Sequence, residues 1–278
     1  MAARRRLDAE LVRRELASSR ELARRWIDER QVTVNGAIAQ KAATMVAPGD
    51  AVEVLAPPPR FVGRGGEKML GALQWFDVDP TGLRCVDVGS STGGFTDCLL
   101  QEGATSVVAI DVGRAQLHER LRGDPRVVVR EQTDVRQVDL ADVGAPFDLV
   151  VIDVSFIGLA RILDSVIPLA GARGRILALV KPQFEAGRSE ADKGKGIIRD
   201  PAVWTDVLQA TTTAASAQGL GVLGVGVSPI KGGAGRSDGN VEFFLDLVGS
   251  ERDQPTPLDE AEIAVAIINA VTVAEELP

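Results

Sequence analysis

The sequence predicts an α/β protein in which a doubly wound sheet of mainly parallel strands follows a small α+β unit. Residues 83–250 alternate between short runs rich in Val, Ile and Leu and segments with helical periodicity. Strands without polar alternation are typical of a parallel sheet buried on both faces, and their alternation with helices is the doubly wound pattern. The last two runs, GVLGVGVSPI and VEFFLDLVG, are expected to form an antiparallel hairpin at the sheet edge.

The amino-terminal unit begins with two predicted helices in the stretch LDAELVRRELASSRELARRWIDER. The second helix can begin at Ser18 or Ser19, because a serine hydroxyl caps unpaired backbone N–H groups. QVTVNGA then predicts a strand with an Asn-Gly turn, and GDAVEVLA predicts the next strand. The helical spacing places six apolar residues near one side: Leu7, Leu11, Leu16, Leu22, Trp26 and Ile27.

Charge is distributed unevenly along the chain. Residues 1–60 hold 11 Lys and Arg against 8 Asp and Glu, whereas residues 61–278 hold 20 against 31. The amino-terminal unit is therefore the expected anion binder, although a net charge of −8 argues against a protein that coats nucleic acid throughout. With 8 Phe, 3 Trp and no Tyr, the chain has few platforms for unpaired bases. Any bound RNA is expected to be recognised by its shape and phosphates.

A linker between the two units is predicted in PPPRFVGRGGEK. Prolines remove backbone donors and stiffen the chain, and glycines allow it to bend, so together they mark a boundary. We therefore expect domains at residues 1–58 and 67–278, joined by a hinge at residues 59–66.

The stretch CVDVGSSTGGFTD marks the expected ligand site of the larger domain. It predicts a strand at Cys85–Val88, a turn at Gly89–Gly94 and a helix from about Phe95. Such a turn presents backbone N–H groups and a helix amino end to a ligand. Its spacing matches neither the G-x-G-x-x-G dinucleotide fingerprint nor a phosphate-binding loop. The turn therefore favours a ligand that carries a carboxylate and no pyrophosphate.

Two acids after the next strands extend this site. Asp111 ends the strand VVAIDV, where a carboxylate usually binds a ribose diol. Asp134 follows the third strand, where an acid can accept a hydrogen bond from an adenine amino group. These features favour S-adenosylmethionine over NAD, whose fingerprint is incomplete, and the alternative is a structural turn with ordinary strand-end acids. The predicted cofactor-binding residues are Asp87, Gly89, Ser91, Thr92, Gly93, Gly94, Phe95, Asp111 and Asp134.

The segment after the fourth strand indicates the methyl acceptor. It reads DVSF from Asp153, which lacks the D/N-P-P-Y platform of enzymes that methylate base amines. No cysteine follows Cys98 to act as a nucleophile on a pyrimidine carbon, so a hydroxyl acceptor is the simplest interpretation. The order of Lys68, Asp153, Lys181 and Glu242 resembles the tetrad of ribose 2′-O-methyltransferases.

This resemblance implies a role for each of the four residues. A ribose hydroxyl ionises far above neutral pH, so a lysine must help to remove its proton or stabilise the resulting charge. Lys181 is expected to activate the 2′-hydroxyl with Asp153 as its orienting partner, and Lys68 and Glu242 to position the substrate. The sequence leaves open whether Lys181 is a true base. Taken alone, each residue is better explained as a solvated or salt-bridged charge, and only the four together favour a catalytic site.

The amino-terminal unit resembles the alpha-L RNA-binding domain, which is named for a small-subunit ribosomal protein. The resemblance rests on the spacing of Arg6-Leu7-Asp8, Ser19-Arg20, Val34-Asn35-Gly36, Lys41 and Gly49-Asp50. It implies that the paired helices present basic side chains to structured RNA. The alternative for any single arginine is a solvated helix face. The implied RNA-binding residues are Arg6, Arg20, Arg24 and Lys41.

Ordered motifs over residues 4–247 are similar to the TlyA family of ribosomal RNA cytidine 2′-O-methyltransferases, also recorded as haemolysins. They are RLDAELVRREL, VTVNG, RGGEK, DVGSSTGGFTD, AIDVG, LVVIDVSFI, LVKPQFE, GKGIIRDP and GNVEFFL. The resemblance implies a Rossmann-like S-adenosylmethionine-dependent methyltransferase sheet with a small α+β amino-terminal RNA-binding domain. It also implies ribosomal RNA within ribosomal subunits as the substrate. The insert RSEADKG and the loop KGGAGRSDG flank the expected site and leave the target nucleotide open.

Two other functions remain as alternatives. One is an RNA-binding assembly factor without catalysis, against which all four tetrad residues argue. The other is a membrane-lytic protein, which needs a span, a barrel or a basic amphipathic helix. The longest apolar run, Ala261–Ala274, is too short for a span and suits a helix packed on a core. Cys85 and Cys98 show neither metal-ligand nor disulfide spacing, so we expect a cytoplasmic protein with no metal and no membrane partner.

Overall fold

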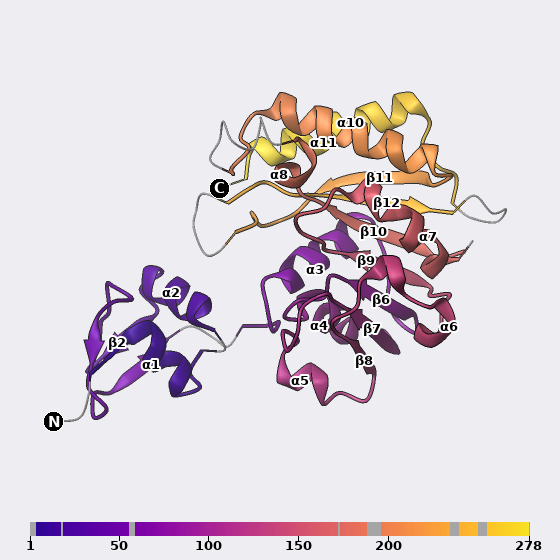
Figure 1. The fold of residues 1–278 in the computed structure, drawn as a ribbon. Coiled ribbons are helices and arrows are strands. Elements are labelled where there is room, and N and C mark those ends of the chain that lie inside the picture. The colour runs from indigo at the N-terminus through magenta and orange to yellow at the C-terminus, as the bar shows by residue number, and fades with distance from the viewer. Residues whose placement is uncertain are drawn as a thin grey trace. The chain divides into compact units, whose positions relative to one another are not determined.

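The computed structural model describes residues 4–17, 19–55, 59–171, 173–187, 196–233, 239–249 and 255–277. The chain forms two compact units, Met1–Arg60 with Gly233–Gly239, and Phe61–Gly232 with Asn240–Pro278 (Figure 1). The division after Arg60 falls within the expected hinge at residues 59–66. Helix α3 (Gly65–Trp75) begins inside the same stretch.

The smaller unit packs two helices, α1 (Leu7–Arg13) and α2 (Arg20–Asp28), onto short antiparallel strands. The expected Asn-Gly turn is confirmed, because Asn35 and Gly36 have φ of 51° and 80° between β2 (Val32–Val34) and β3 (Ala37–Ile38). Ser19 caps α2 by accepting a hydrogen bond from the Leu22 N–H at 3.1 Å, and Ser18 lies outside the described residues. One sheet pairs β1 (Arg5–Arg6) with β4 (Met45–Val46), and the other has the order β3 (Ala37–Ile38), β2 (Val32–Val34), β5 (Val52–Val54).

The apolar side predicted for these helices is confirmed except at one position. Leu7, Leu11, Trp26 and Ile27 are buried in one cluster, with the partly buried Leu22 packed against it. The expectation for Leu16 was wrong, because this residue is 36% exposed. Helix α1 ends at Arg13, so the helical spacing does not continue to Leu16.

The larger unit is built on one seven-stranded sheet of order β11-β12-β10-β9-β6-β7-β8. The strands from β10 to β8 in this order are parallel, as predicted, and β12 is antiparallel to both β10 and β11. The expected antiparallel hairpin of the last two strands is therefore confirmed at one edge. The strands are β6 (Arg84–Val88), β7 (Ser106–Ile110), β8 (Val127–Arg130), β9 (Leu149–Ile152), β10 (Arg175–Val180), β11 (Gly221–Val227) and β12 (Phe243–Val248).

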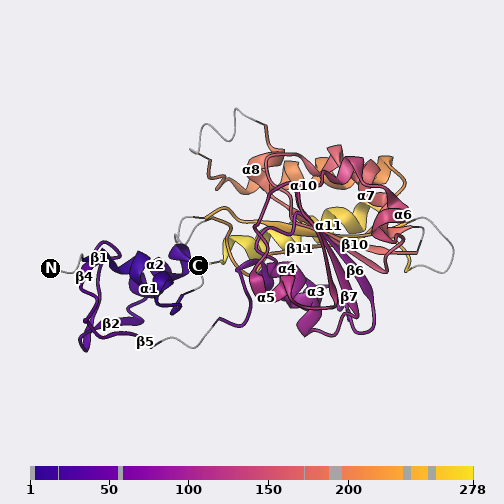
Figure 2. The same cartoon turned by 60° about the horizontal axis from the view of Figure 1, so that its bottom comes forward.

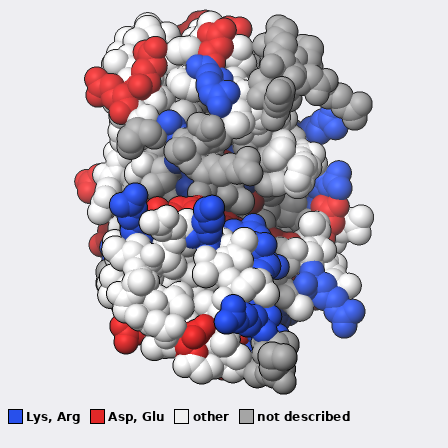
Figure 3. All heavy atoms as spheres, turned by 90° about the vertical axis from the view of Figure 1, so that its left-hand side faces the viewer, with Lys and Arg blue, Asp and Glu red and all other residues white. Residues whose placement is uncertain are grey.

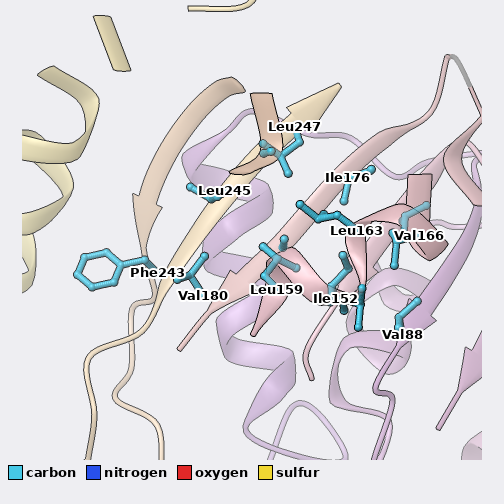
Figure 4. Close-up of a cluster of buried hydrophobic side chains, with 14 of the residues drawn as sticks. Val88, Ile152, Leu159, Leu163, Val166, Ile176, Val180, Phe243, Leu245 and Leu247 are labelled. Atoms are coloured by element: carbon cyan, nitrogen blue, oxygen red, sulfur yellow. The ribbon is translucent and has the colours of Figure 1, made fainter. Parts of the chain in front are cut away.

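Helices cover both faces of this sheet, as its unbroken apolar strands require. One core cluster joins α7, α10 and α11 to strand residues such as Val88, Ile152 and Ile176 (Figure 4). A second cluster joins α3 and α4 to alternate residues such as Leu149 and Leu177. Figure 2 shows α7 and α10 on one side of the sheet and α3 and α4 on the other. The remaining helices are α4 (Gly94–Gln101), α5 (Glu119–Arg122), α6 (Leu140–Val143), α7 (Leu163–Ala170), α8 (Pro182–Glu185), α10 (Pro201–Ala217) and α11 (Glu260–Glu275), with short 3₁₀ turns at Val135–Gln137 and Leu159–Arg161.

The carboxyl ends of the parallel strands meet at one edge of the sheet, where doubly wound proteins bind their ligands. Glu242 reaches this edge from the antiparallel strand, because it directly precedes β12 and Phe243 pairs with Val180 at the end of β10. Four other residues lie at the same edge because each directly follows a parallel strand: Gly89 after β6, Asp111 after β7, Asp153 after β9 and Lys181 after β10.

Candidate active site

The glycine turn after β6 brings backbone groups to the carboxyl edge of the sheet. Helix α4 begins at Gly94, one residue before the expected start. Gly89 has a φ of +87°, and a Cβ atom there would lie 2.4 Å from the carbonyl oxygen of Asp153. A Cβ atom at Gly94 would lie 2.8 Å from the backbone nitrogen of Gly66. Glycine is therefore required for the close approach of β6 to β9 and of α3 to α4.

Asp87 lies on β6 and is fully buried behind the turn. Its Oδ2 accepts hydrogen bonds from the N–H and the hydroxyl of Thr96 at 3.0 and 2.7 Å, whereas its Oδ1 has no partner among the described residues. Burial raises the pKa of Asp87 to about 7 despite Thr96, and the nearby carboxylates of Asp153 and Asp111 also raise it. A cation at the turn would stabilise the ionised carboxylate, so the site fits a positively charged ligand.

Asp111 and Asp134 differ in how their carboxylates are used. The two oxygens of Asp111 accept the backbone N–H groups of Ser91 at 2.8 Å and Gly113 at 2.6 Å. This braces the turn while leaving lone pairs that a ribose hydroxyl could use. Asp134 caps a 3₁₀ turn and pairs with Arg136, with the shortest contact at 2.6 Å. An adenine amino group would therefore share the Asp134 carboxylate with a guanidinium.

Glu131 shapes the loop that follows Asp111, and sequence reasoning missed it. Its carboxylate accepts the backbone N–H groups of residues 115–117 at 2.7 to 3.1 Å and pairs with Arg122. The loop begins with Val112, which is 72% exposed beside the expected ribose site. The sequence signal was an acid just after the third strand, but its partners lie nine to sixteen residues away and share no motif with it.

The four residues of the expected catalytic tetrad form two neighbouring ion pairs. Lys68 Nζ donates to Glu242 Oε2 at 2.5 Å, and both residues are buried. Lys181 Nζ pairs with Asp153 Oδ1 and donates to Ser155 Oγ at 2.9 Å. Pairing of β10 with β12 places the backbones of Lys181 and Glu242 side by side. Buried lysines held by carboxylates can position a hydroxyl group and stabilise charge that develops on it.

The loop after β9 carries a second feature that the sequence did not reveal. Phe156 is 90% exposed and has a φ of +65°, a backbone conformation that costs of order 1–3 kcal/mol in a residue with a bulky side chain. Its ring lies 4.9 Å from the ring of Phe184, measured between centroids. The preceding residue, Ser155, accepts the hydrogen bond from Lys181. An exposed aromatic ring is therefore held next to the Lys181–Asp153 pair.

Helix α8 braces this loop at three points. Lys181, just before the helix, contacts Asp153 and Ser155, and Phe184 contacts Phe156. Glu185, the last residue of α8, accepts through Oε1 a hydrogen bond from the N–H of Leu159 at 2.8 Å, where the loop after β9 enters its 3₁₀ turn. Burial raises the pKa of Glu185 above its usual range. The motif KPQFE thus holds one side of the site through residues spaced along a single turn.

Residues of the expected hinge line the glycine turn from the other side. Phe61 is buried in the second core cluster with α3 and α4. Asp97 on α4 accepts the N–H of Val62 at 2.8 Å, and both of its oxygens accept from Arg120 at 2.7 and 2.8 Å. From Phe61 onward the hinge therefore packs as part of the larger unit.

In the smaller unit, three of the four expected RNA-binding residues meet at one carboxylate. Arg6 Nε, Arg20 Nη2 and Arg24 Nε donate to the fully buried Asp8 at 3.0, 2.9 and 3.0 Å. Lys41 is exposed and makes no side-chain contact with this cluster among the described residues. Figure 3 shows Lys and Arg side chains spread over the middle and lower part of the face that it displays.

Comparison with known proteins places both units. The FtsJ-like methyltransferase model matches residues 61–247, and the S4 domain model matches residues 5–52. The 16S/23S rRNA (cytidine-2′-O)-methyltransferase TlyA of Mycobacterium tuberculosis is 44% identical over 248 residues, which cover 89% of this chain and 91% of the relative. The chain belongs to the TlyA family of FtsJ-like methyltransferases.

Two further relatives of this TlyA-family chain span most of its length. YqxC of Bacillus subtilis, which is named as an rRNA methyltransferase, is 44% identical over 87% of this chain and 85% of the relative. A solved structure of a Streptococcus thermophilus protein described as a hemolysin has a TM-score of 0.75 and 34% identity. It covers 99% of this chain and 98% of that one.

Membership of the TlyA family confirms the predicted fold, the amino-terminal RNA-binding domain and the cofactor. S-adenosylmethionine is the methyl donor of this enzyme, as of FtsJ-like methyltransferases. The residues at the turn fit it, because the unpaired Oδ1 of Asp87 suits a cationic group and the Asp111 carboxylate suits a diol.

Some relatives of this TlyA-family chain are named hemolysins. In the part of the chain that the structure describes, none of the helices is long and apolar enough to cross a bilayer. The apolar run at the end of the sequence forms α11, which buries Ile267 and Ala270 against the core, as predicted. Cys85 and Cys98 are both buried, and they form no disulfide with each other.

Proposed function

We propose that the protein transfers a methyl group from S-adenosylmethionine to the 2′-hydroxyl of a cytidine ribose in ribosomal RNA. The observation that carries this proposal is the pair of buried Lys–carboxylate contacts, Lys68–Glu242 and Lys181–Asp153, at the edge that also holds the glycine turn. A hydroxyl acceptor needs a group that manages its proton, and a buried lysine is suited to that task. The names of the relatives support ribosomal RNA and cytidine as the substrate.

Each tetrad residue has a role in this proposal. S-adenosylmethionine supplies an electrophilic methyl group. Lys181, as an ammonium group held by Asp153 and Ser155, would contact the 2′-oxygen and stabilise the negative charge that develops on it. The hydroxyl proton would pass to water, and the cofactor would leave as neutral S-adenosylhomocysteine. The Lys68–Glu242 pair holds the ribose from the neighbouring strand. Because both lysines are fixed before the substrate arrives, little orientational freedom is lost during the reaction.

Phe156 is proposed to stack on the base of the acceptor nucleotide. Lys181 is buried, so we propose that the acceptor nucleotide leaves the RNA stack to bring its ribose to this lysine, and an exposed aromatic side chain can replace the lost base stacking. Phe156 is the residue after Ser155, and its strained backbone is kept by the contacts of Phe184 and Glu185 with the same loop. The site would thus combine a stacking surface on the loop after β9 with a charge-stabilising group, Lys181, that contacts the same loop.

The S4 domain is proposed to hold the ribosomal subunit through phosphates, with Arg6, Arg20, Arg24 and Lys41 as contacts. The proposed domain limits are residues 1–58 and 67–278. Within the segment 59–66 between them, the residues from Phe61 onward pack on the larger unit, so any bending would be confined to the residues before Phe61. Because ribosomal subunits are the proposed substrate, the reaction is placed in the cytoplasm.

The proposal is tested by methyl transfer from labelled S-adenosylmethionine to unmodified ribosomal subunits of each size. The native protein should label RNA, and Lys181→Ala should lower kcat by about three orders of magnitude, since charge stabilisation by a preorganised group contributes on the order of 10²–10³ or more. Arg161→Ala removes an exposed cation of the same unit and serves as the matched control. Label that persists unchanged in Lys181→Ala would contradict the assigned role. No label with either subunit, despite normal cofactor binding, would favour the assembly-factor alternative.

A further inference from the structure

The carboxylate of Asp8 is unusual because it is fully buried yet surrounded by side chains that are not. Asp8 lies in the first turn of α1 with an exposed fraction of 0%. Arg6 grips both of its oxygens, with Nε to Oδ1 at 3.0 Å and Nη2 to Oδ2 at 3.3 Å. Arg20 and Arg24 donate to Oδ2 at 2.9 and 3.0 Å. One acid therefore gathers three arginines that are separated by up to eighteen positions in the sequence.

These arginines keep part of each guanidinium at the surface. Their side chains are 45%, 51% and 52% exposed for Arg6, Arg20 and Arg24, while the carboxylate between them is inaccessible. Three guanidinium charges and one carboxylate charge leave a net charge of +2 on the cluster. Burial by itself raises the pKa of Asp8, but hydrogen bonds from the three arginines outweigh it and hold this pKa well below its usual range. The carboxylate therefore stays ionised and offsets the repulsion among the arginines.

A second acid of α1 provides a contrast within the same helix. Glu10 is also buried, and it pairs with Arg13 and Arg14. The remaining donors of Arg14 are used by three backbone carbonyls, those of Asp50, Ala47 and Pro48, so that this arginine fastens the loop before β5. By comparison, Asp8 accepts every hydrogen bond that the side chains of Arg6, Arg20 and Arg24 donate among the described residues.

We propose that Asp8 is a positioning residue that presents Arg6, Arg20 and Arg24 as one preformed site for two adjacent phosphates of folded RNA. A guanidinium has five donors in a planar fork, so binding an acid through one edge leaves donors for a phosphate on the other. Holding the forks in place beforehand reduces the conformational entropy that is lost on binding. A net charge of +2 matches the charge of two phosphodiesters. The inference rests on the proposed RNA substrate and adds how the S4 domain recognises it.

The variant Asp8→Asn separates preorganisation from simple charge. It makes the domain one charge more positive, so a charge-only account expects tighter RNA binding and a salt dependence steeper by about 0.7–0.9 in log–log slope. Preorganisation expects the opposite: affinity for unmodified ribosomal subunits falls roughly tenfold and the slope becomes shallower by about one, because phosphate contacts are lost. Asp28→Asn removes an exposed acid from α2 with the same change in charge and is the matched control. It should leave affinity unchanged or raise it slightly.

A second comparison keeps the test valid if Asp8→Asn fails to fold. Arg20→Gln and Arg13→Gln each remove one guanidinium that pairs with a buried acid, and the two side chains are equally exposed, at 51% and 50%. Neither change leaves the buried acid without a partner, because Asp8 still pairs with Arg6 and Arg24, and Glu10 still pairs with Arg14. Arg20→Gln should weaken binding of ribosomal subunits about tenfold, and Arg13→Gln by less than twofold. Equal losses in the two variants would overturn the proposal.

The outcomes distinguish this inference from the proposed function. If the native protein methylates subunits but folded Asp8→Asn binds them more tightly, the positioning role is wrong and the enzymatic proposal stands. If the native protein neither binds nor methylates subunits, the proposed function itself fails. Weaker binding by folded Asp8→Asn, with unchanged affinity for S-adenosylmethionine, supports the inference. Far-ultraviolet circular dichroism of each variant establishes that it is folded.

Discussion

Replacement of Asp87 by asparagine should stabilise the ligand-free protein at pH 8 while weakening its affinity for S-adenosylmethionine. Asp87 is fully buried, and burial raises its pKa from 3.8 to about 7. An acid whose folded-state pKa is raised takes up a proton on folding between its two pKa values. Its contribution to stability is therefore most favourable below pH 3.8, becomes less favourable as pH rises, and is least favourable above pH 7.

The size of the effect follows from the difference between the two pKa values. A difference of about 3 corresponds to about 4 kcal/mol of destabilisation above pH 7. Asparagine keeps the shape of the side chain and an oxygen that can accept from Thr96, but it buries an amide nitrogen with no acceptor, at a cost of about 1–3 kcal/mol. The variant should therefore gain about 1–3 kcal/mol at pH 8. At pH 5 the folded native carboxyl is protonated, and the gain should disappear.

Urea unfolding at pH 5 and pH 8 measures this difference. The chain has 3 tryptophans, and Trp26→Phe removes the one in the smaller unit, so the fluorescence of Trp75 and Trp204 follows the larger unit alone. Titration calorimetry should show a greater loss of affinity for S-adenosylmethionine than for S-adenosylhomocysteine, whose sulfur is neutral. A stability difference that is the same at both pH values would contradict the raised pKa of Asp87, and equal losses for the two ligands would contradict its contact with the cationic sulfur.

Three further predictions concern the loop after β9 and the turn after β6. Phe156→Gly should raise the melting temperature, because glycine adopts the positive φ at this position without strain. The same variant should lower kcat/KM for ribosomal subunits at least tenfold while its affinity for the cofactor stays unchanged, and unchanged kinetics would exclude a stacking role. Glu185→Ala should lower kcat/KM about tenfold, whereas Glu185→Gln, which still has an oxygen to accept the Leu159 N–H, should retain most activity; similar kinetics for both would show that this hydrogen bond is unimportant. Gly89→Ala should unfold or strongly destabilise the protein, by about 3 kcal/mol or more on thermal unfolding, because its Cβ would overlap the Asp153 carbonyl oxygen; a native melting temperature would contradict the close approach of β6 and β9.

The parts of the site that could be predicted from the sequence are those fixed by topology and by contiguous motifs. Short apolar runs give the strands, and parallel strands bring their carboxyl ends to one edge, so Asp111, Asp153 and Lys181 had to lie near the turn at Gly89. The turn itself is a single contiguous stretch whose glycines have visible steric reasons. Its helix begins within one residue of the expected position, because the helical pattern starts where the glycines end.

The parts that escaped prediction depend on side-chain directions and on contacts between distant segments. Ser155 gained its role from a hydrogen bond with a residue 26 positions away. The positive φ of Phe156 has no sequence signature, because most turns with this geometry contain glycine or asparagine. Asp8 was part of a recognised motif, but only the folded unit shows that it collects three arginines. Leu16 was misplaced because apolar spacing alone does not reveal where a helix ends.

The most direct test of the central claim is the chemical position of the transferred methyl group. Ribosomal subunits methylated with labelled S-adenosylmethionine would be extracted and their RNA hydrolysed in alkali, which cleaves a phosphodiester only beside a free 2′-hydroxyl. We expect the label to appear in an alkali-resistant dinucleotide that begins with 2′-O-methylcytidine. Label found entirely in mononucleotides, and hence on a base, would contradict the assignment of Lys181, Asp153, Lys68 and Glu242 to a ribose hydroxyl.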